Sequence, residues 1–140
     1  MKLKNIVVLD ETGSTNKYLK NLINDKILPD GFVVTAKYQT EGKGQTGNEW
    51  LSEPGKNLTL SILLKPAFLP ADHLFLISKA VSLAMVDYFN SIDNHNFKIK
   101  WPNDIYYNDK KIAGILIENQ ILGDKIQYSV VGIGLNINQV

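Results

Sequence analysis

Two lysine-bearing segments have the composition to bind an anionic ligand. Gly42–Gly47 reads G-K-G-Q-T-G, and its glycines allow backbone N–H groups to approach an anion while Lys43 adds charge. Lys110 and Lys111 are followed by Ile112-Ala113-Gly114, where the small residues indicate close packing against the backbone. For either segment taken alone, a surface turn or a hairpin rim with solvated lysines explains the pattern as well.

The segment Gly42–Gly47 also matches the G-x-G-x-x-G pattern of dinucleotide-binding folds. That site requires a strand before the glycines and a helix directly after them. A β-rich run precedes the segment, but Asn48–Gly55 has the composition of a loop. We therefore predict no Rossmann site here, and phosphate binding remains open.

Three further segments carry polar or glycine residues in unusual combinations. Ser14-Thr15-Asn16 has the composition of a helix N-cap. In Lys100–Asp104, proline biases the preceding Trp101 to extended geometry, and the following Asn and Asp can bridge backbone groups or orient a nearby lysine. Gly132–Asn136 is typical of a strand end that meets a ligand, or of a β-bulge.

The elements that must position these segments follow from hydrophobic periodicity. Helical spacing predicts an amphipathic helix over 15–25, and a second helix over about 70–91 that is apolar on most sides and therefore expected to be buried. Alternating or β-rich runs predict strands over 6–9, 32–38, 58–64, 97–101, 105–107, 112–118 and 126–131, the last of which runs on to Gly134. Two helices with clustered strands and short turns predict an α+β fold with a mixed, mostly antiparallel sheet.

Composition limits the classes of function. The 140 residues suit one domain spanning 1–140, and the net charge of +1 gives no overall attraction to nucleic acid or anionic membrane. The absence of cysteine excludes disulfides and thiolate chemistry. His73 and His95 lie apart, outside any metal-ligand motif. Without a signal peptide or a membrane-length apolar run, we expect a soluble, cytoplasmic protein.

Together and in this order, the segments resemble the biotin–protein ligase family. The resemblance runs from about Thr12 to Asn138. Its most specific parts are Lys100–Asp104 and the lysine–x–alanine–glycine block that continues to Glu118. The other matching parts are Ser14-Thr15-Asn16, Gln39, Gly42-Lys43-Gly44 with Trp50, and Gly132–Asn136.

The resemblance implies a class II aminoacyl-tRNA synthetase-like fold, with a largely antiparallel sheet backed by helices. It also implies a ligase that uses ATP to convert biotin to biotinyl-5′-AMP and then biotinylates a lysine of a biotin carboxyl-carrier domain. Mg²⁺ would arrive with ATP, because no carboxylate cage for a metal is visible. Two alternatives stay open: a lipoate ligase or octanoyltransferase, and a fragment that binds biotin without completing transfer.

The resemblance further assigns roles to individual residues. The predicted catalytic cation is Lys111. The predicted biotin-binding residues are Ser14, Thr15, Asn16, Gln39, Gly42, Lys43, Gly44, Gln45, Lys111, Gly114 and Gly132. The predicted ATP- or AMP-binding residues are Lys43, Asn48, Trp50, Lys111 and Asn136, and the predicted orienting residues are Lys100, Trp101, Asn103 and Asp104.

The chain departs from the family pattern in two respects. Many members carry arginine where this chain has Gln45, which keeps hydrogen bonding but lacks the charge and the planar fork. The chain also stops at Val140, so we expect an incomplete catalytic domain, without an N-terminal helix-turn-helix or a C-terminal β-barrel. No DNA binding is expected, and an exposed edge strand leaves a homodimer possible.

Overall fold

The computed structural model describes residues 4–93 and 96–138, so His95 and Val140 lie outside the described residues. Along the chain the main elements are β1 (Ile6–Thr12), α1 (Thr15–Asp25), β2 (Val33–Gln39), β3 (Asn57–Leu64), α2 (Phe75–Ile92), β4 (Phe97–Lys100), β5 (Asp104–Tyr107), β6 (Lys110–Leu122) and β7 (Lys125–Asn136). Short 3₁₀ turns lie at Gln45–Gly47 and Ala71–His73.

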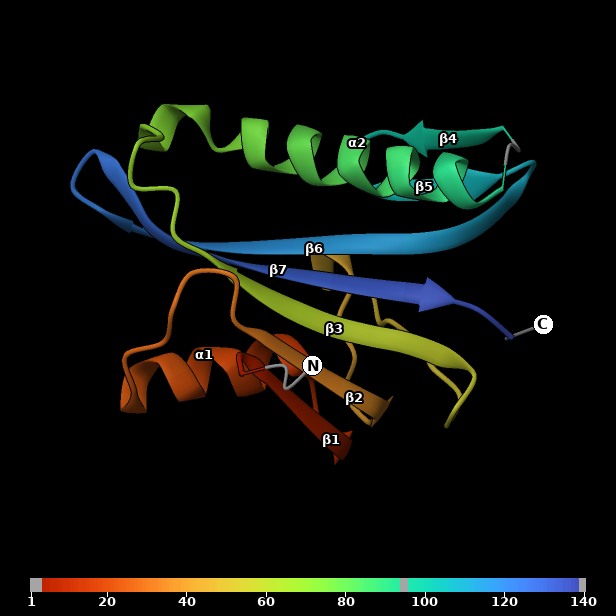
Figure 1. Cartoon of the computed structure of the whole chain (residues 1–140), viewed down its shortest axis with the longest axis horizontal. Helices are drawn as coiled ribbons and strands as arrows, with labels where there is room; N and C mark the ends of the chain where they lie inside the picture. The colour runs from red at the N-terminus through yellow and green to blue at the C-terminus, as the bar shows by residue number, and fades with distance from the viewer. Residues whose placement is uncertain (1–3, 94–95, 139–140) are drawn as a thin grey trace.

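The strands form one seven-stranded sheet in the order β1-β2-β3-β7-β6-β5-β4 (Figure 1). β1 and β2 are parallel and are connected through α1, and each remaining neighbouring pair is antiparallel. The prediction of an α+β fold with a mixed, mostly antiparallel sheet is confirmed.

The two helices cover opposite faces of the sheet (Figure 1). Each face can carry its own core, because successive side chains of a strand point to opposite faces. On one face, Leu19 of α1 packs with Leu63 and Val130, all fully buried. On the other face, α2 packs on a cluster that includes Ile115 and Val131. The neighbouring residues Val130 and Val131 of β7 thus belong to different cores, one on the α1 face of the sheet and one on the α2 face.

Three strands are longer than the sequence pattern predicts. β1 continues to Thr12, β6 reaches Leu122 and β7 runs from Lys125 to Asn136. The added ends of β1 and β6 are mostly exposed and are held by backbone pairing of β1 with β2 and of β6 with β7. Hydrophobic alternation is lost where neither face is buried, so periodicity could not find these ends.

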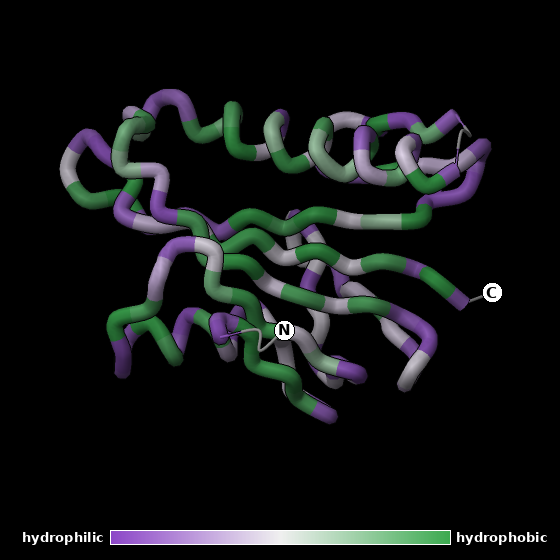
Figure 2. Tube along the Cα trace, in the orientation of Figure 1, coloured by the Kyte–Doolittle hydropathy of each residue, from purple (hydrophilic) through white to green (hydrophobic). Residues whose placement is uncertain are grey.

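The prediction that the second helix is buried is wrong. Within α2 only Ile77 and Ser82 are buried, while Leu83, Tyr88 and Ile92 are more than half exposed. The helix is apolar on several sides (Figure 2), but a single sheet can cover only the side that faces it. No helix in the described part of the chain combines the length and hydrophobicity needed to cross a bilayer.

Candidate active site

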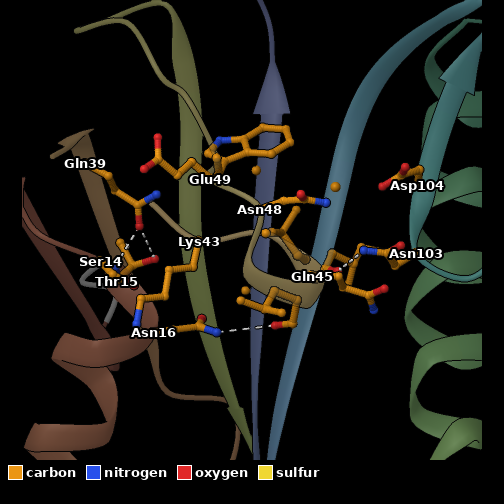
Figure 3. A pocket seen from close by; sticks show the side chains of 18 of the residues that line it. Ser14, Thr15, Asn16, Gln39, Lys43, Gln45, Asn48, Glu49, Asn103 and Asp104 are labelled. Atoms are coloured by element: carbon orange, nitrogen blue, oxygen red, sulfur yellow. Dashed lines mark hydrogen bonds between the residues drawn. The ribbon is translucent and has the colours of Figure 1, made fainter. Parts of the chain in front are cut away.

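A cavity of about 220 Å³ lies on the α1 face of the sheet, between the start of α1 and the loop 42–50 (Figure 3). It collects most of the predicted site residues from separate parts of the chain. Those that line it are Ser14, Thr15, Asn16, Gln39, Lys43, Gly44, Gln45, Asn48, Trp50, Asn103, Asp104, Lys111, Gly114 and Gly132. Gly42, Lys100, Trp101 and Asn136 are predicted site residues that do not line it.

One end of the cavity is polar and is formed by the start of α1. Thr15 is buried, and both its backbone N–H and its hydroxyl lie within hydrogen-bonding distance of Gln39 Oε1, at 2.7 and 3.0 Å (Figure 3). The N-cap prediction is confirmed at Ser14, whose Oγ accepts a bond of 3.4 Å from the backbone N–H of Lys17. The same segment therefore caps a helix and lines the cavity.

The cap can be separated from ligand binding by mutation. We expect Ser14→Ala to lower the free energy of unfolding by about 0.5–1 kcal/mol, at the low end for a cap because the bond is long. Ser14→Asp should keep the cap, and urea denaturation of both variants measures the difference. If Ser14 also contacts ligand, both variants should weaken biotin binding, whereas equal stability of wild type and Ser14→Ala would contradict the cap.

Glycines form the floor of the cavity and are covered by other side chains of the protein. A Cβ at Gly132 would lie 2.6 Å from Asn16 Oδ1, and a Cβ at Gly134 would lie 2.3 Å from the indole of Trp50. Gly114, which pairs with Gly134 across β6 and β7, would place a Cβ 2.8 Å from the same indole. These glycines lie in a continuous β ladder and allow Asn16 and Trp50 to approach the sheet.

The loop 42–50 covers the cavity and is closed at its base by backbone pairing. Trp50 N–H donates to Gly42 O at 2.9 Å, and Gly44 N–H donates to Asn48 O at 2.7 Å. After a 3₁₀ turn at Gln45–Gly47 the chain is extended, so no helix follows the glycines and the rejection of a Rossmann site is confirmed. Lys43 extends from the loop toward Asn16 (Figure 3).

Lys111 lies at the other end of the cavity because of a β-bulge. The register between β5 and β6 shifts so that Ile105 pairs with Ala113 but Tyr106 pairs with Lys111, which inserts one extra residue into β6. Bulges of this kind redirect side chains. The Lys111 ammonium lies 3.0 Å from Asp104 Oδ1 and 5.4 Å from the ring centroid of Trp50. The Lys111 side chain, which is 38% exposed, thus presents a cation beside an aromatic face.

The segment Lys100–Asp104 places only its last two residues at the cavity. Asn103 is fixed to β6, since its Nδ2 donates to Ile115 O at 2.8 Å and its own O accepts from Ile115 N–H at 2.9 Å. Trp101 is 74% exposed and packs against Phe75 of α2, and Lys100 lies over the ring of Tyr106. The predicted orienting role therefore has structural support at Asn103 and Asp104 alone.

Asn136 and Gly42 act from outside the cavity. Asn136 Nδ2 donates to the backbone O of Lys111 at 3.3 Å, and its Oδ1 accepts from Asn57 at 2.9 Å. Gly42 is buried under the backbone of Trp50. In this structure both support residues of the cavity, Lys111 and Trp50.

Several residues of the site were missed by sequence analysis. Ser61 and Glu118 contact Asn16 from behind the cavity wall. The indole of Trp50 packs directly on the backbone of Gly134. A run of alternating residues in β3 gives no sign that one serine is functional. The spacing of Gly132 and Gly134 could have indicated the latter, because both lie on one face of a strand.

The electrostatics of the site depend on two polar groups, the half-buried Glu118 carboxylate and the buried indole N–H of Trp50. Burial raises the pKa of Glu118, but hydrogen bonds from Lys20 and Asn16 and the charges of Lys20 and Lys43 outweigh it and hold that pKa below its usual value. Glu118 is therefore ionised at neutral pH. Trp50 Nε1 is buried and has no acceptor among the described residues. Within residues 4–93 and 96–138, no three His, Asp or Glu side chains gather to hold a metal ion.

Comparison with known proteins assigns the chain to the family that the order of its motifs indicated. Residues 8–136 match the model of the biotin/lipoate A/B protein ligase family. The chain belongs to this family. It is 33% identical over 136 residues to the bifunctional ligase/repressor BirA of Bacillus spizizenii, a match that covers 97% of this chain and 41% of that protein.

Solved structures of biotin protein ligases share the fold. The ligase from Aquifex aeolicus in complex with biotin and ATP has a TM-score of 0.80 at 33% identity and is matched over 98% of this chain and 54% of its own. The ligase from Leishmania major in complex with biotinyl-5-AMP has a TM-score of 0.74 at 30% identity, with 97% and 58% covered. The expected biotin ligase and class II synthetase-like fold is confirmed, and the chain spans about half of these structures.

Proposed function

We propose that this chain supplies the biotin-binding and adenylating part of a biotin–protein ligase. The observation that carries the proposal is that a single cavity joins one end lined by the neutral hydrogen-bonding side chains of Thr15 and Gln39, toward which Lys43 also extends, to a second end with the Lys111 cation. Biotin has the matching form, since its ureido ring hydrogen bonds without charge and its valerate chain ends in a carboxylate.

The reaction requires cations at the carboxylate end. In the activation step the biotin carboxylate oxygen attacks the α-phosphorus of ATP, the bond to the β-phosphate oxygen breaks, and pyrophosphate leaves with its electron pair. Negative charge builds on the α-phosphoryl oxygens, where Lys111 can stabilise it from a fixed position beside Asp104. Mg²⁺ would be carried by the nucleotide and would offset phosphate charge.

Trp50 has two features that suit a nucleotide neighbour. Its indole lies flat on the glycine floor formed by Gly114 and Gly134, and its buried Nε1 lacks an acceptor in the described structure. A buried donor left unpaired costs about 1–3 kcal/mol, and a ligand oxygen would remove that cost.

In the second step a lysine amine of the carrier domain attacks the acyl carbon of biotinyl-5′-AMP, and AMP leaves.

The ligands found in structures of relatives support the ligand assignment. The Aquifex aeolicus ligase binds biotin and ATP, and the Leishmania major ligase binds biotinyl-5-AMP. The family also includes lipoate ligases. Lipoate lacks ureido N–H groups, so the polar end at Gln39 gives it no comparable partner.

A pyrophosphate-release assay with biotin and ATP tests the proposal directly. Release that depends on both substrates supports adenylation, and transfer of labelled biotin to a carrier domain tests the second step. Binding of biotin without pyrophosphate release would reduce the proposal to a biotin-binding fragment. Stronger competition by lipoate than by biotin would replace it with the lipoate branch of the family.

Gln45 is the residue whose replacement should change retention of the intermediate. It lines the cavity in the 3₁₀ turn of the covering loop, where many family members carry arginine, and the whole sequence contains no arginine. We expect Gln45→Arg to change release of biotinyl-5′-AMP less than about threefold, because the rest of the loop, including Lys43, is intact. Quantifying free adenylate measures this, with Gln45→Lys as a charge control. A large fall in release in the arginine variant would show that the wild type leaks.

A further inference from the structure

A chain of polar contacts, partly buried at Glu118 and buried at Ser61, runs from outside the cavity to its polar end. Glu118 accepts from Lys20 Nζ at 2.8 Å and from Asn16 Nδ2 at 2.9 Å. Asn16 Oδ1 lies 2.5 Å from Ser61 Oγ, which lies 2.8 Å from Thr15 Oγ1. Ser61 is fully buried, and neither Ser61 nor Glu118 lines the cavity.

The Glu118 carboxylate fixes the orientation of the Asn16 amide. A carboxylate only accepts hydrogen bonds, so it must face the NH₂ group of Asn16. The second acceptor for that group, Leu116 O, is 3.3 Å away and contributes less. Asn16 Oδ1 is thereby directed at Ser61. An amide turned the other way would place its oxygen against the ionised Glu118.

Counting hydroxyl protons then fixes the direction of the remaining contacts. Asn16 Oδ1 cannot donate, so its 2.5 Å contact uses the single proton of Ser61. The single hydroxyl proton of Thr15 then has two acceptors within reach, Ser61 Oγ at 2.8 Å and Gln39 Oε1 at 3.0 Å. We assign it to the shorter contact, because the oxygens of Ser61 and Thr15 would otherwise face each other without a proton. With that assignment Gln39 Oε1 accepts only from the backbone N–H of Thr15 and keeps a lone pair for a ligand.

We propose that Glu118 and Ser61 are positioning residues that hold Thr15 and Gln39 as hydrogen-bond acceptors, so that this end of the cavity selects a ligand with N–H donors. The proposal rests on the proposed function and deepens it, because the ureido ring of biotin carries such donors. Neither residue touches the ligand. Lys20 contributes by keeping Glu118 ionised.

Replacing Glu118 by glutamine keeps its size and removes the constraint. The introduced amide can offer its own NH₂ group to Asn16, which frees the Asn16 amide to turn. Ser61 would then donate to Thr15 and Thr15 to Gln39, and the free acceptor would be lost. We expect biotin affinity to fall about tenfold, which is about the contribution of one hydrogen bond between neutral groups.

The test compares biotin with the two carbamate analogues in which one ureido N–H is replaced by a ring oxygen. Calorimetry on the full chain should show a strong preference for biotin in wild type. In Glu118→Gln, the preference over the analogue that lacks the N–H facing Gln39 should be about tenfold smaller, with the affinity of that analogue changed less than about threefold, whereas the other analogue should weaken together with biotin. Ser61→Ala should act in the same direction. Glu11→Gln, an exposed carboxyl on β1, is the matched control and should behave as wild type.

The outcomes separate this inference from the proposed function. Equal weakening of biotin and both analogues in Glu118→Gln, or no weakening, overturns the positioning role alone. Nuclear magnetic resonance provides a readout without ligand: the side-chain amide protons of Asn16 should exchange with solvent slowly in wild type and faster in Glu118→Gln. Fast exchange of these protons in wild type would also overturn the positioning role. Absence of biotin binding by wild type overturns the proposed function and this inference with it.

Discussion

Replacing Lys111 by alanine should slow formation of biotinyl-5′-AMP by about 10²–10³-fold, equivalent to roughly 3–4 kcal/mol of transition-state stabilisation. The ammonium already lies 3.0 Å from Asp104 and beside the Trp50 ring, so little movement is needed when charge develops on the phosphate. The loss should fall mainly on kcat, because an interaction that strengthens in the transition state is removed. Single-turnover measurement of adenylate formation checks this.

The neighbouring residue provides the matched control. Lys110 is exposed, lies one position earlier on β6 and does not line the cavity, so Lys110→Ala should retain the wild-type rate. Lys111→Arg keeps the charge and should retain more activity than Lys111→Ala. A rate for Lys111→Ala within about threefold of wild type would remove Lys111 from the catalytic role.

Gly42→Ala should disrupt the loop that covers the cavity. The added Cβ would lie 2.4 Å from the backbone O of Trp50, and a backbone atom cannot rotate away as a flexible side chain can. Movement of Trp50 would strain the bond from its N–H to Gly42 O and lift the indole from Gly114 and Gly134. We expect a loss of about 2 kcal/mol in stability, and a biotin affinity about 30-fold weaker if the loop contacts the ligand.

Urea denaturation and calorimetry with biotin measure the two effects of Gly42→Ala. Gly44→Ala is the matched structural control, since its Cβ would have no neighbour closer than 3.5 Å and its φ of −103° is open to alanine. It should change the free energy of unfolding by less than about 0.5 kcal/mol. Equal stability of the two variants would show that the loop accommodates the clash.

The sequence was sufficient to find the elements that carry the site. Helical spacing from Tyr18 to Ile23 predicted α1, and Ser14 predicted where it begins. Alternation from Leu58 to Leu64 predicted β3, although the apolar residues of that pattern are only partly buried or exposed and the buried positions are Thr59, Ser61 and Leu63. These signals are local, and they survive folding because burial repeats with the period of the element.

The placement of the site residues depended on contacts between distant parts of the chain. Periodicity predicted α2 but not that much of its apolar surface stays exposed, since that depends on how much sheet lies beneath it. The segment around Trp101 read as one motif, yet the fold brings Asn103 to the cavity and turns Trp101 to the surface. Spacing along a chain does not show which side of a turn faces a ligand.

The sequence by itself determined the order of the motifs, the α+β class and the supply of cations that an acyl-adenylate chemistry needs. Only the tertiary structure decided that a bulge directs Lys111 toward Asp104, that glycines of β6 and β7 lie under Trp50, and that Glu118 controls the amide of Asn16. The physical reason is range. Propensity and periodicity act within a few residues, whereas each of these contacts, apart from the short β5–β6 connection, joins segments tens of residues apart.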